Sequence, residues 1–208
     1  MKSTVNTYIF SLFLSVQLLC VCAPTPVSAQ SPIQQFDDRI MINLANHRTP
    51  ETTNFMMFLS TSFKYVELGI PAGLFIGGVA SGDKEMRQNA LYVGSSTVVS
   101  VGLTLLAKHL IKRPRPFIKN INIIPVYRPT STSFPSGHTS STFAPATALS
   151  IAYPKWYVIA PSFLWSGAVG YSRMYLGVHY PTDVAAGAIL GSGTAIFMNP
   201  LLRKPMIN

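Results

Sequence analysis

Five apolar segments occupy most of the chain after residue 65. Several of them are shorter than the ~20 residues that a helix needs to span a bilayer. They are rich in Gly, Ala and Ser, the residues that let membrane helices pack closely against one another. The pattern predicts an all-α, integral-membrane bundle of about five core helices. These helices are expected roughly over residues 66–82, 89–107, 138–153, 157–171 and 184–199.

Polar and apolar residues are mixed in the stretch before these segments, residues 31–64. Within it, the sequence FDDRIMINLANH places Phe36, Ile40 and Leu44 at helical spacing. A helix with such an apolar stripe is suited to lie along a membrane surface. We therefore expect a surface helix ahead of the bundle.

The first 29 residues have the organisation of a secretory signal segment. Lys2 precedes the apolar stretch YIFSLFLSVQLLCVC, and the sequence VSAQ provides a small-x-small cleavage site after Ala29. We expect residues 1–29 to be a signal peptide, with an uncleaved anchor helix as the alternative, and residues 30–208 to form one domain. Both cysteines, Cys20 and Cys22, lie in the signal segment, so its removal would leave a chain without thiols or disulfides.

The charges are few and unevenly distributed. Only 11% of the residues are charged, and the formal net charge is +9. Between residues 88 and 182 there are eight Lys or Arg and no Asp or Glu, which favours an anionic partner. The basic residues sit at the ends of apolar runs and do not form a polar helical face. This placement indicates a phosphate-bearing small molecule or lipid, and we expect no nucleic-acid partner.

The same charges predict how the bundle is oriented. If residue 30 lies outside, the short inner loops carry Lys84, Arg87 and Lys155, as the positive-inside rule requires. The loop of residues 108–136 then lies outside and is strongly basic, against the rule. Its charges therefore indicate a role other than setting topology.

Three polar clusters share the outer face in this topology. Each has an ordinary structural explanation: basic residues reach lipid headgroups, a PSGH sequence forms a turn and helix cap, and a His–Asp pair forms a local hydrogen bond. Their convergence on one face of a small bundle favours a functional site. The clusters are Lys108, Lys112, Arg113 and Arg115; Ser136, Gly137 and His138; and Arg173, His179 and Asp183.

The residue types narrow the chemistry of that site. From Met86 onward Asp183 is the one carboxylate, which is too few for a two-metal site or an octahedral Mg²⁺ site. A zinc site would need His109 together with two other histidines, and His109 lacks a suitable spacing. We expect no metal and no cofactor. A histidine nucleophile and a histidine acid, surrounded by Lys and Arg, remain.

Asp183 follows His179 by four residues, and this spacing suggests a role for the pair. A nucleophilic imidazole needs one nitrogen unprotonated and aimed at its target, and a carboxylate that accepts the other N–H fixes that tautomer. Phosphoryl transfer also needs positive donors on the phosphate oxygens, which Lys108, Arg115 and Arg173 can supply. Gly137 lets the backbone approach an anion at the start of a helix.

The three clusters together resemble the signature of the type 2 phosphatidic acid phosphatase (PAP2) superfamily, which is K-x6-R-P, P-S-G-H and S-R-x5-H-x3-D. Every motif position matches in residue type, spacing and order. The resemblance implies the helical fold shared with vanadate haloperoxidases and a metal-independent phosphatase that works through a phosphohistidine on His179. It also implies His138 as general acid and Asp183 as the partner of His179. The phosphate-binding residues it implies are Lys108, Arg115, Ser136, Gly137 and Arg173. Lys112 and Arg113 lie outside the signature and could meet a second phosphate or a headgroup of the substrate.

The apolar segments favour the membrane branch of this family. We expect an enzyme of the bacterial inner membrane, multi-pass, with its site facing the periplasm. Its expected substrate is a lipid phosphate or prenyl diphosphate, of the phosphatidic acid, phosphatidylglycerol phosphate, undecaprenyl diphosphate or lipid A type. Two alternatives remain open: a periplasmic acid phosphatase for small soluble phosphomonoesters, and a non-enzymatic anion-binding membrane protein. The sequence does not specify an oligomeric state.

Overall fold

The computed structural model describes residues 31–202, so the predicted signal segment lies outside the described residues. The chain divides into two units, residues 1–34 and residues 35–208. The second unit contains the bundle and is described here by itself.

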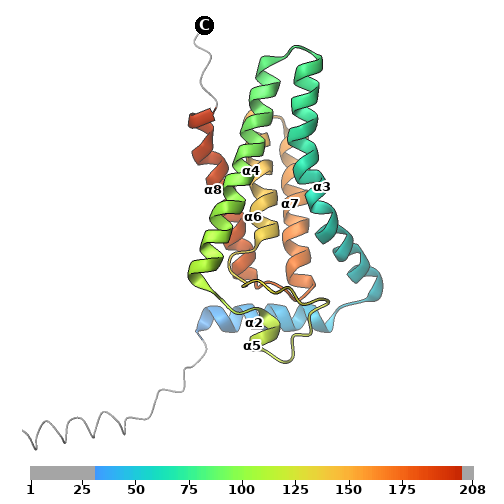
Figure 1. Ribbon diagram of the computed structural model, residues 1–208. Helices are drawn as coiled ribbons and strands as arrows, with labels where there is room; N and C mark the ends of the chain where they lie inside the picture. The colour runs from blue at the N-terminus through green and yellow to red at the C-terminus, as the bar shows by residue number, and fades with distance from the viewer. Residues whose placement is uncertain (1–30, 203–208) are drawn as a thin grey trace, which may run out of the picture. The chain divides into compact units, whose positions relative to one another are not determined.

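The described residues form helices and contain no strand, which confirms the all-α prediction (Figure 1). Five long helices correspond to the five predicted apolar segments, and two further helices lie outside the bundle core. The helices are α2 (Pro32–Asn46), α3 (Pro50–Ala80), α4 (Lys84–Ile111), α5 (Pro116–Lys119), α6 (Gly137–Ala152), α7 (Trp156–Tyr175) and α8 (Pro181–Leu202).

Helix α3 begins well before the apolar segment that predicted it. Thr49 is its N-cap, and the Thr49 hydroxyl accepts a hydrogen bond from the backbone N–H of Thr52 at 3.2 Å. Pro50 follows at the first helical position, where a proline is favoured. Further along, the hydroxyls of Thr61 and Ser62 donate to carbonyls of the preceding turn, so these polar residues fit inside the helix.

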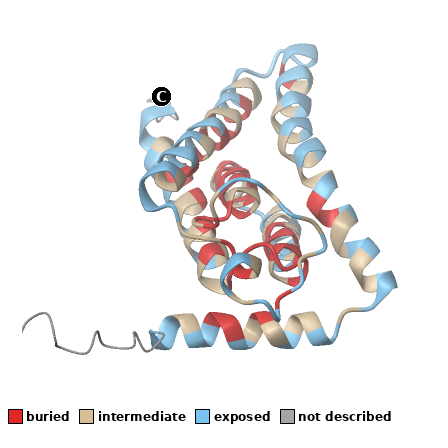
Figure 2. Cartoon of the chain, turned by 60° about the horizontal axis from the view of Figure 1, so that its bottom comes forward, coloured by how far each residue is buried: buried red, intermediate tan, exposed pale blue. Residues whose placement is uncertain are grey.

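Within the described part of the chain, three stretches are long and apolar enough to cross a membrane: Pro50–Ala80, Lys84–Lys119 and Pro181–Leu202. Helix α6 has 16 residues, too few to span a bilayer fully. Most of its residues are buried by the surrounding helices, and Figure 2 shows buried residues concentrated on the inward-facing sides of the helices. The short helix α6 is therefore accommodated inside the bundle, where the surrounding helices cover it.

Helices α6 and α8 touch backbone to backbone because α8 carries glycine at two positions one turn apart. A Cβ at Gly187 would lie 2.6 Å from the Ser136 carbonyl oxygen, and one at Gly191 would lie 2.3 Å from the Ser140 carbonyl oxygen. On its other side α6 is held to α4 by a 2.7 Å hydrogen bond between the hydroxyls of Thr104 and Ser140. This close packing places the N-termini of α6 and α8 side by side.

Helix α2 forms as predicted, but its buried face is not the apolar stripe. Phe36 is exposed, whereas Asp37, Asp38 and Met41 are buried. Met41 packs with Ile123 and Tyr180 in a small core cluster. Helix α2 is therefore attached to one end of the bundle through Asp37, which contacts Arg113 and Thr182, and through Met41.

Candidate active site

All eight site residues predicted from the sequence lie at the same end of the bundle. They come from four helix ends and two loops: Lys108 from the last turn of α4, Arg115 from the loop after it, Ser136, Gly137 and His138 from the start of α6, Arg173 from the last turn of α7, His179 from the α7–α8 loop, and Asp183 from the first turn of α8. Residues that are up to 75 positions apart along the chain (183 − 108) thus share one site.

His179 is buried at the centre of the site, with 2% of its surface exposed. The Arg115 Nη1 atom lies 3.3 Å from His179 Nε2, and the Asp183 Oδ2 atom lies 3.7 Å from His179 Nδ1. Because a guanidinium can only donate, the first contact requires an unprotonated Nε2. The proton of the neutral ring is then on Nδ1, facing Asp183, and the lone pair of Nε2 faces the cations.

The surroundings of His179 keep its imidazole neutral. The pKa of His179 is lowered to about 3, mainly by burial and also by the positive charges of Arg173 and Arg115, while Asp183 opposes the shift. A neutral imidazole has the free electron pair that a nucleophile needs.

Asp183 is fully buried, and its carboxylate is occupied by donors other than the histidine. Arg113 Nη1 donates to Oδ1 at 2.6 Å, while the Ser133 hydroxyl and the Tyr180 backbone N–H donate to Oδ2 at 2.5 and 3.0 Å. The 3.7 Å separation from His179 Nδ1 is longer than a hydrogen bond. Asp183 therefore lies beside His179 as the sequence predicts, but the direct hydrogen bond is not formed here, because stronger donors hold the carboxylate.

Three cations around His179 have neutral hydrogen-bond partners. Lys108 Nζ donates to the Thr132 and Ser133 carbonyls. Arg115 donates to the Val178 carbonyl and to both the carbonyl and hydroxyl of Ser131. Arg173 donates to the Ser60 hydroxyl and lies against the Tyr127 ring, 5.5 Å from its centroid. Burying a charge without a counter-ion is costly, so this arrangement is suited to receive an anion.

The N-terminus of α6 adds backbone donors to the same place. Ser136 is the N-cap, but its side chain caps no backbone N–H; its hydroxyl oxygen instead accepts a hydrogen bond from Thr139. The Ser136 N–H donates to the Asp183 carbonyl at 3.0 Å, which ties α6 to α8. A Cβ at Gly137 would meet just a methyl of Thr104, at 3.7 Å. The protein itself thus has room for a side chain at Gly137, and the glycine leaves that room for an anion at the helix start.

His138 lies beside these groups at the mouth of a cavity. Its ring packs on Phe63 of α3, with 4.0 Å between centroids. The cavity has a volume of about 260 Å³ and is lined by Lys108, Gly137 and His138 together with Phe63, Glu67, Val101, Thr104, Leu105 and Ser141. Helices α3 and α4 contribute the apolar side chains of Phe63, Val101 and Leu105 to the same cavity that Lys108 and His138 line.

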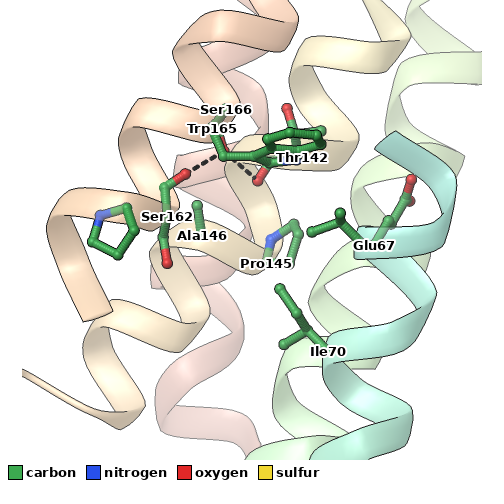
Figure 3. Close-up of a pocket in the computed structure, with 10 residues that line it drawn as sticks. Glu67, Ile70, Thr142, Pro145, Ala146, Ser162, Trp165 and Ser166 are labelled. Atoms are coloured by element: carbon green, nitrogen blue, oxygen red, sulfur yellow. Dashed lines mark hydrogen bonds between the residues drawn. The ribbon is translucent and has the colours of Figure 1, made fainter. Parts of the chain in front are cut away.

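A second cavity, of about 200 Å³, lies deeper in the bundle between α3, α6 and α7 (Figure 3). Its walls are also largely apolar, with Ile70, Pro145 and Trp165 among them. Glu67 of α3 lines both this cavity and the one beside His138. The two hollows therefore border the same side chain.

The structure corrects the interpretation of Arg113. The sequence allows Arg113 to meet a second phosphate or a headgroup, but its guanidinium is held between two carboxylates, Asp37 at 2.7 Å and Asp183 at 2.6 Å. Asp37, Ser60 and Ser133 also contact the site, and the sequence does not identify them. Asp37 and Ser60 lie before the predicted core segments, so nothing in the local pattern links them to the motifs.

Within residues 31–202, no group of three or more His, Cys, Asp or Glu side chains is arranged to hold a metal ion. The positive charge of the site comes from Lys and Arg side chains and from the start of α6.

This arrangement defines a helical membrane protein with a buried histidine inside an anion-binding pocket. Residues 89–206 match the PAP2 superfamily, and the chain belongs to that family. It is a phosphatase of PAP2 type.

Similar proteins agree with this assignment. An undecaprenyl-diphosphatase of Sulfolobus acidocaldarius is 32% identical over 155 residues, which cover 73% of this chain and 72% of that protein. The crystal structure of LpxE from Aquifex aeolicus has a TM-score of 0.66 at 29% identity and covers 78% of this chain and 94% of that one. A transmembrane phosphatidylglycerolphosphate phosphatase from Bacillus subtilis has the same fold, with a TM-score of 0.67 at 24% identity over 97% of this chain and 96% of that one.

Proposed function

We propose that the protein hydrolyses the phosphate of a membrane lipid, a lipid phosphate or a prenyl diphosphate, through a phosphohistidine formed on His179. One observation carries this proposal: three cations, the buried Arg115 and Arg173 and the half-buried Lys108, have neutral partners and surround a neutral histidine. A phosphate that enters this pocket supplies the missing negative charge. In many phosphoryl-transfer enzymes, metal ions neutralise the charge of the transferring phosphoryl group. In this proposal the three cations neutralise that charge.

In the first half of the proposed reaction, Nε2 of His179 attacks the phosphorus atom. The N–P bond forms as the bond between phosphorus and the leaving oxygen breaks. Lys108, Arg115 and Arg173 stabilise the negative charge on the remaining phosphate oxygens, together with the backbone N–H groups at the start of α6. Positive charge develops on the His179 ring, and Asp183 next to Nδ1 stabilises it.

His138 moves the protons in this scheme. In the first half it gives its proton to the leaving oxygen, an alkoxide from a monoester or a phosphate from a diphosphate. In the second half it takes a proton from water, whose oxygen attacks phosphorus while the N–P bond breaks. The products are inorganic phosphate and the dephosphorylated lipid, and both histidines return to their starting states. Phe63, stacked on the His138 ring, holds it at the pocket.

A lipid substrate fits the cavity between α3 and α4. The cavity joins His138 and Lys108 to an apolar wall that includes Phe63, Val101 and Leu105, so a phosphate can reach the cations while the adjoining hydrocarbon stays among apolar side chains. The similar proteins named above include a prenyl diphosphatase, which supports this substrate class. We therefore favour a lipid over a small soluble phosphomonoester.

We also propose that the enzyme lies in a bacterial inner membrane with the site at the periplasmic face. The support is the charge of the loops: Lys84 and Arg87 lie at the opposite end of α4 from Lys108, as the positive-inside rule predicts for that orientation. A secretory signal over residues 1–29, as the sequence predicts, agrees with an outward-facing site.

Phosphate release by the detergent-purified protein tests the proposal. The panel is undecaprenyl diphosphate, phosphatidylglycerol phosphate, lipid A and p-nitrophenyl phosphate, each in excess EDTA and each with His179→Ala alongside. Release from a lipid that resists EDTA and disappears in His179→Ala supports the proposal. Release that requires a metal ion, or that survives in His179→Ala, overturns the mechanism. Turnover of the soluble ester alone overturns the substrate class.

A further inference from the structure

Arg113 connects the catalytic carboxylate to a helix outside the membrane-spanning bundle. Its Nη1 atom donates to Asp183 Oδ1 at 2.6 Å and to the Thr182 hydroxyl at 2.7 Å, and its Nη2 atom donates to Asp37 Oδ2 at 2.7 Å. The guanidinium also lies 4.1 Å from the centroid of the Tyr180 ring. One side chain thus contacts Tyr180, Thr182 and Asp183, which follow His179 closely in the chain, and one residue of α2.

Asp37 closes the connection from the other side. It is fully buried, its Oδ1 accepts a hydrogen bond from the Thr182 backbone N–H at 3.1 Å, and its Oδ2 accepts one from the Thr182 hydroxyl at 2.5 Å. Asp37, Arg113 and Asp183 therefore form a row of alternating charges, negative, positive, negative, in which both carboxylates are fully buried. Neither Asp37 nor Arg113 belongs to the family signature.

We propose that Arg113 and Asp37 are positioning residues that act through Asp183, holding it against His179 and limiting the negative charge that it presents to the ring. This inference rests on the proposed function, because it assigns the pair a part in the same reaction. It also makes α2 a component of the catalytic site, although no substrate contact is assigned to that helix.

The geometry explains why an arginine is needed at this position. Two nitrogens of one planar guanidinium reach two carboxylates that lie on different elements, α2 and α8, and its face is stacked on Tyr180. A lysine ammonium is a single point charge and cannot reproduce this fork. Asp183 is thereby fixed by donors on both oxygens, so it stays in place while positive charge develops on His179.

The electrostatic effect has a definite sign. Without the charge of Arg113, Asp183 would attract a proton on His179 more strongly, and the pKa of His179 would rise. Asp37, then unpaired, would add to that rise. Removing the charge of Asp37 from the same variant should therefore reverse part of the change. The other charged and titratable groups that face this region are Lys108 of α4, Arg115 and Tyr127 of the α4–α6 connection, His138 of α6 and Arg173 of α7.

The test measures the pKa of His179 directly and kcat/KM separately. The chain has four histidines, so ¹⁵N-histidine NMR in detergent can follow His179, with its signal assigned by its loss in His179→Asn. The variants are Arg113→Gln, Asp37→Asn, their double variant, and Arg113→Lys. Lys119→Gln is the matched control, since it removes one positive charge from an exposed position of the same α4–α6 connection.

We expect Arg113→Gln to raise the pKa of His179 and to lower kcat/KM about 10- to 100-fold, the usual size when a group that orients an active side chain is lost. The double variant should have a pKa closer to wild type than Arg113→Gln. Arg113→Lys should lower kcat while it leaves the pKa near wild type, because it keeps the charge and loses the fork. Lys119→Gln should match wild type.

Equal behaviour of Arg113→Gln and Lys119→Gln overturns the inference. So does an activity loss in Arg113→Gln that comes with no pKa change and no reversal in the double variant, since this is the result for a purely structural contact. If Arg113→Gln does not fold, Arg113→Lys decides: wild-type kcat in that variant overturns the inference. The NMR result does not depend on turnover, so an inactive wild type with these pKa changes would contradict the proposed function and leave the positioning network standing.

Discussion

The contact between α6 and α8 offers a sharp test of how the fold positions the site. We predict that Gly191→Ala moves the start of α8 away from the start of α6. The new Cβ would lie 2.3 Å from the Ser140 carbonyl oxygen and 3.0 Å from the Ala144 nitrogen. Both atoms belong to the backbone, so neither can rotate away. The two helices must therefore move apart by about 1 Å before these atoms reach ordinary van der Waals contact.

The expected cost follows from that displacement. Overpacking of this kind typically lowers the free energy of unfolding by about 1–3 kcal/mol. It also disturbs the Ser136–Asp183 hydrogen bond, which joins the phosphate-binding turn to the carboxylate beside His179. A shift of ~1 Å at reacting groups can reduce the rate about 100-fold.

Thermal unfolding in detergent and phosphate release measure the two effects. Gly193→Ala is the matched control, because a Cβ at Gly193, two residues further along the same helix, would meet no atom within 4 Å. It should be as stable and as active as wild type. Equal stability and turnover of Gly191→Ala and Gly193→Ala would refute the argument that the glycine contact positions the site.

Three further predictions follow from the site itself. Asp183→Asn should reduce kcat by up to ~10⁴-fold, because it removes the charge that stabilises a positive His179 ring, and a near-normal rate would make the His–Asp pair purely structural. Gly177→Ala should lower the free energy of unfolding by at least about 1 kcal/mol, since Gly177 has φ +79° and its Cβ would lie 3.1 Å from Pro125 Cα; calorimetry in detergent measures this. The pKa of His179 is lowered to about 3 in the folded protein. In phosphate-free buffer the protein should therefore become less stable as the pH falls below 6.5, because the unfolded chain binds a proton on His179 and the folded chain does not. For one group, the free energy of unfolding changes by up to about 1.4 kcal/mol per pH unit. His179→Asn should reduce this slope, and an unchanged slope would contradict the argument that burial lowers the pKa of His179.

Sequence reasoning succeeded where the information is local. Apolar runs rich in small residues predict packed membrane helices, and the positions of α4, α6, α7 and α8 agree with them. It was less successful at α3, whose first 16 residues (50 to 65) are too polar to be recognised as part of a membrane helix. Their hydroxyls bond to the helix's own carbonyls, a solution that a hydropathy pattern does not reveal.

The residues that gather in the candidate site were also recognisable from the sequence, because phosphoryl transfer restricts which residue types can serve. The sequence therefore predicts the histidine pair, the carboxylate and the three cations by type and spacing. The sequence did not predict that Arg113 pairs with Asp37 and Asp183, because nothing in the sequence around a loop arginine indicates which carboxylate it will contact.

What the sequence determined by itself was the class of fold and the chemical groups of the site. What the tertiary structure alone decided was their pairing: Arg113 with Asp37 and Asp183, and Arg173 with Ser60. The physical reason is that helix formation and apolar burial depend on residues a turn or two apart, whereas these pairs join positions more than 60 residues apart (183 − 113 = 70 at the least). Such contacts depend on how the helices pack, and here the glycines of α8 set that packing.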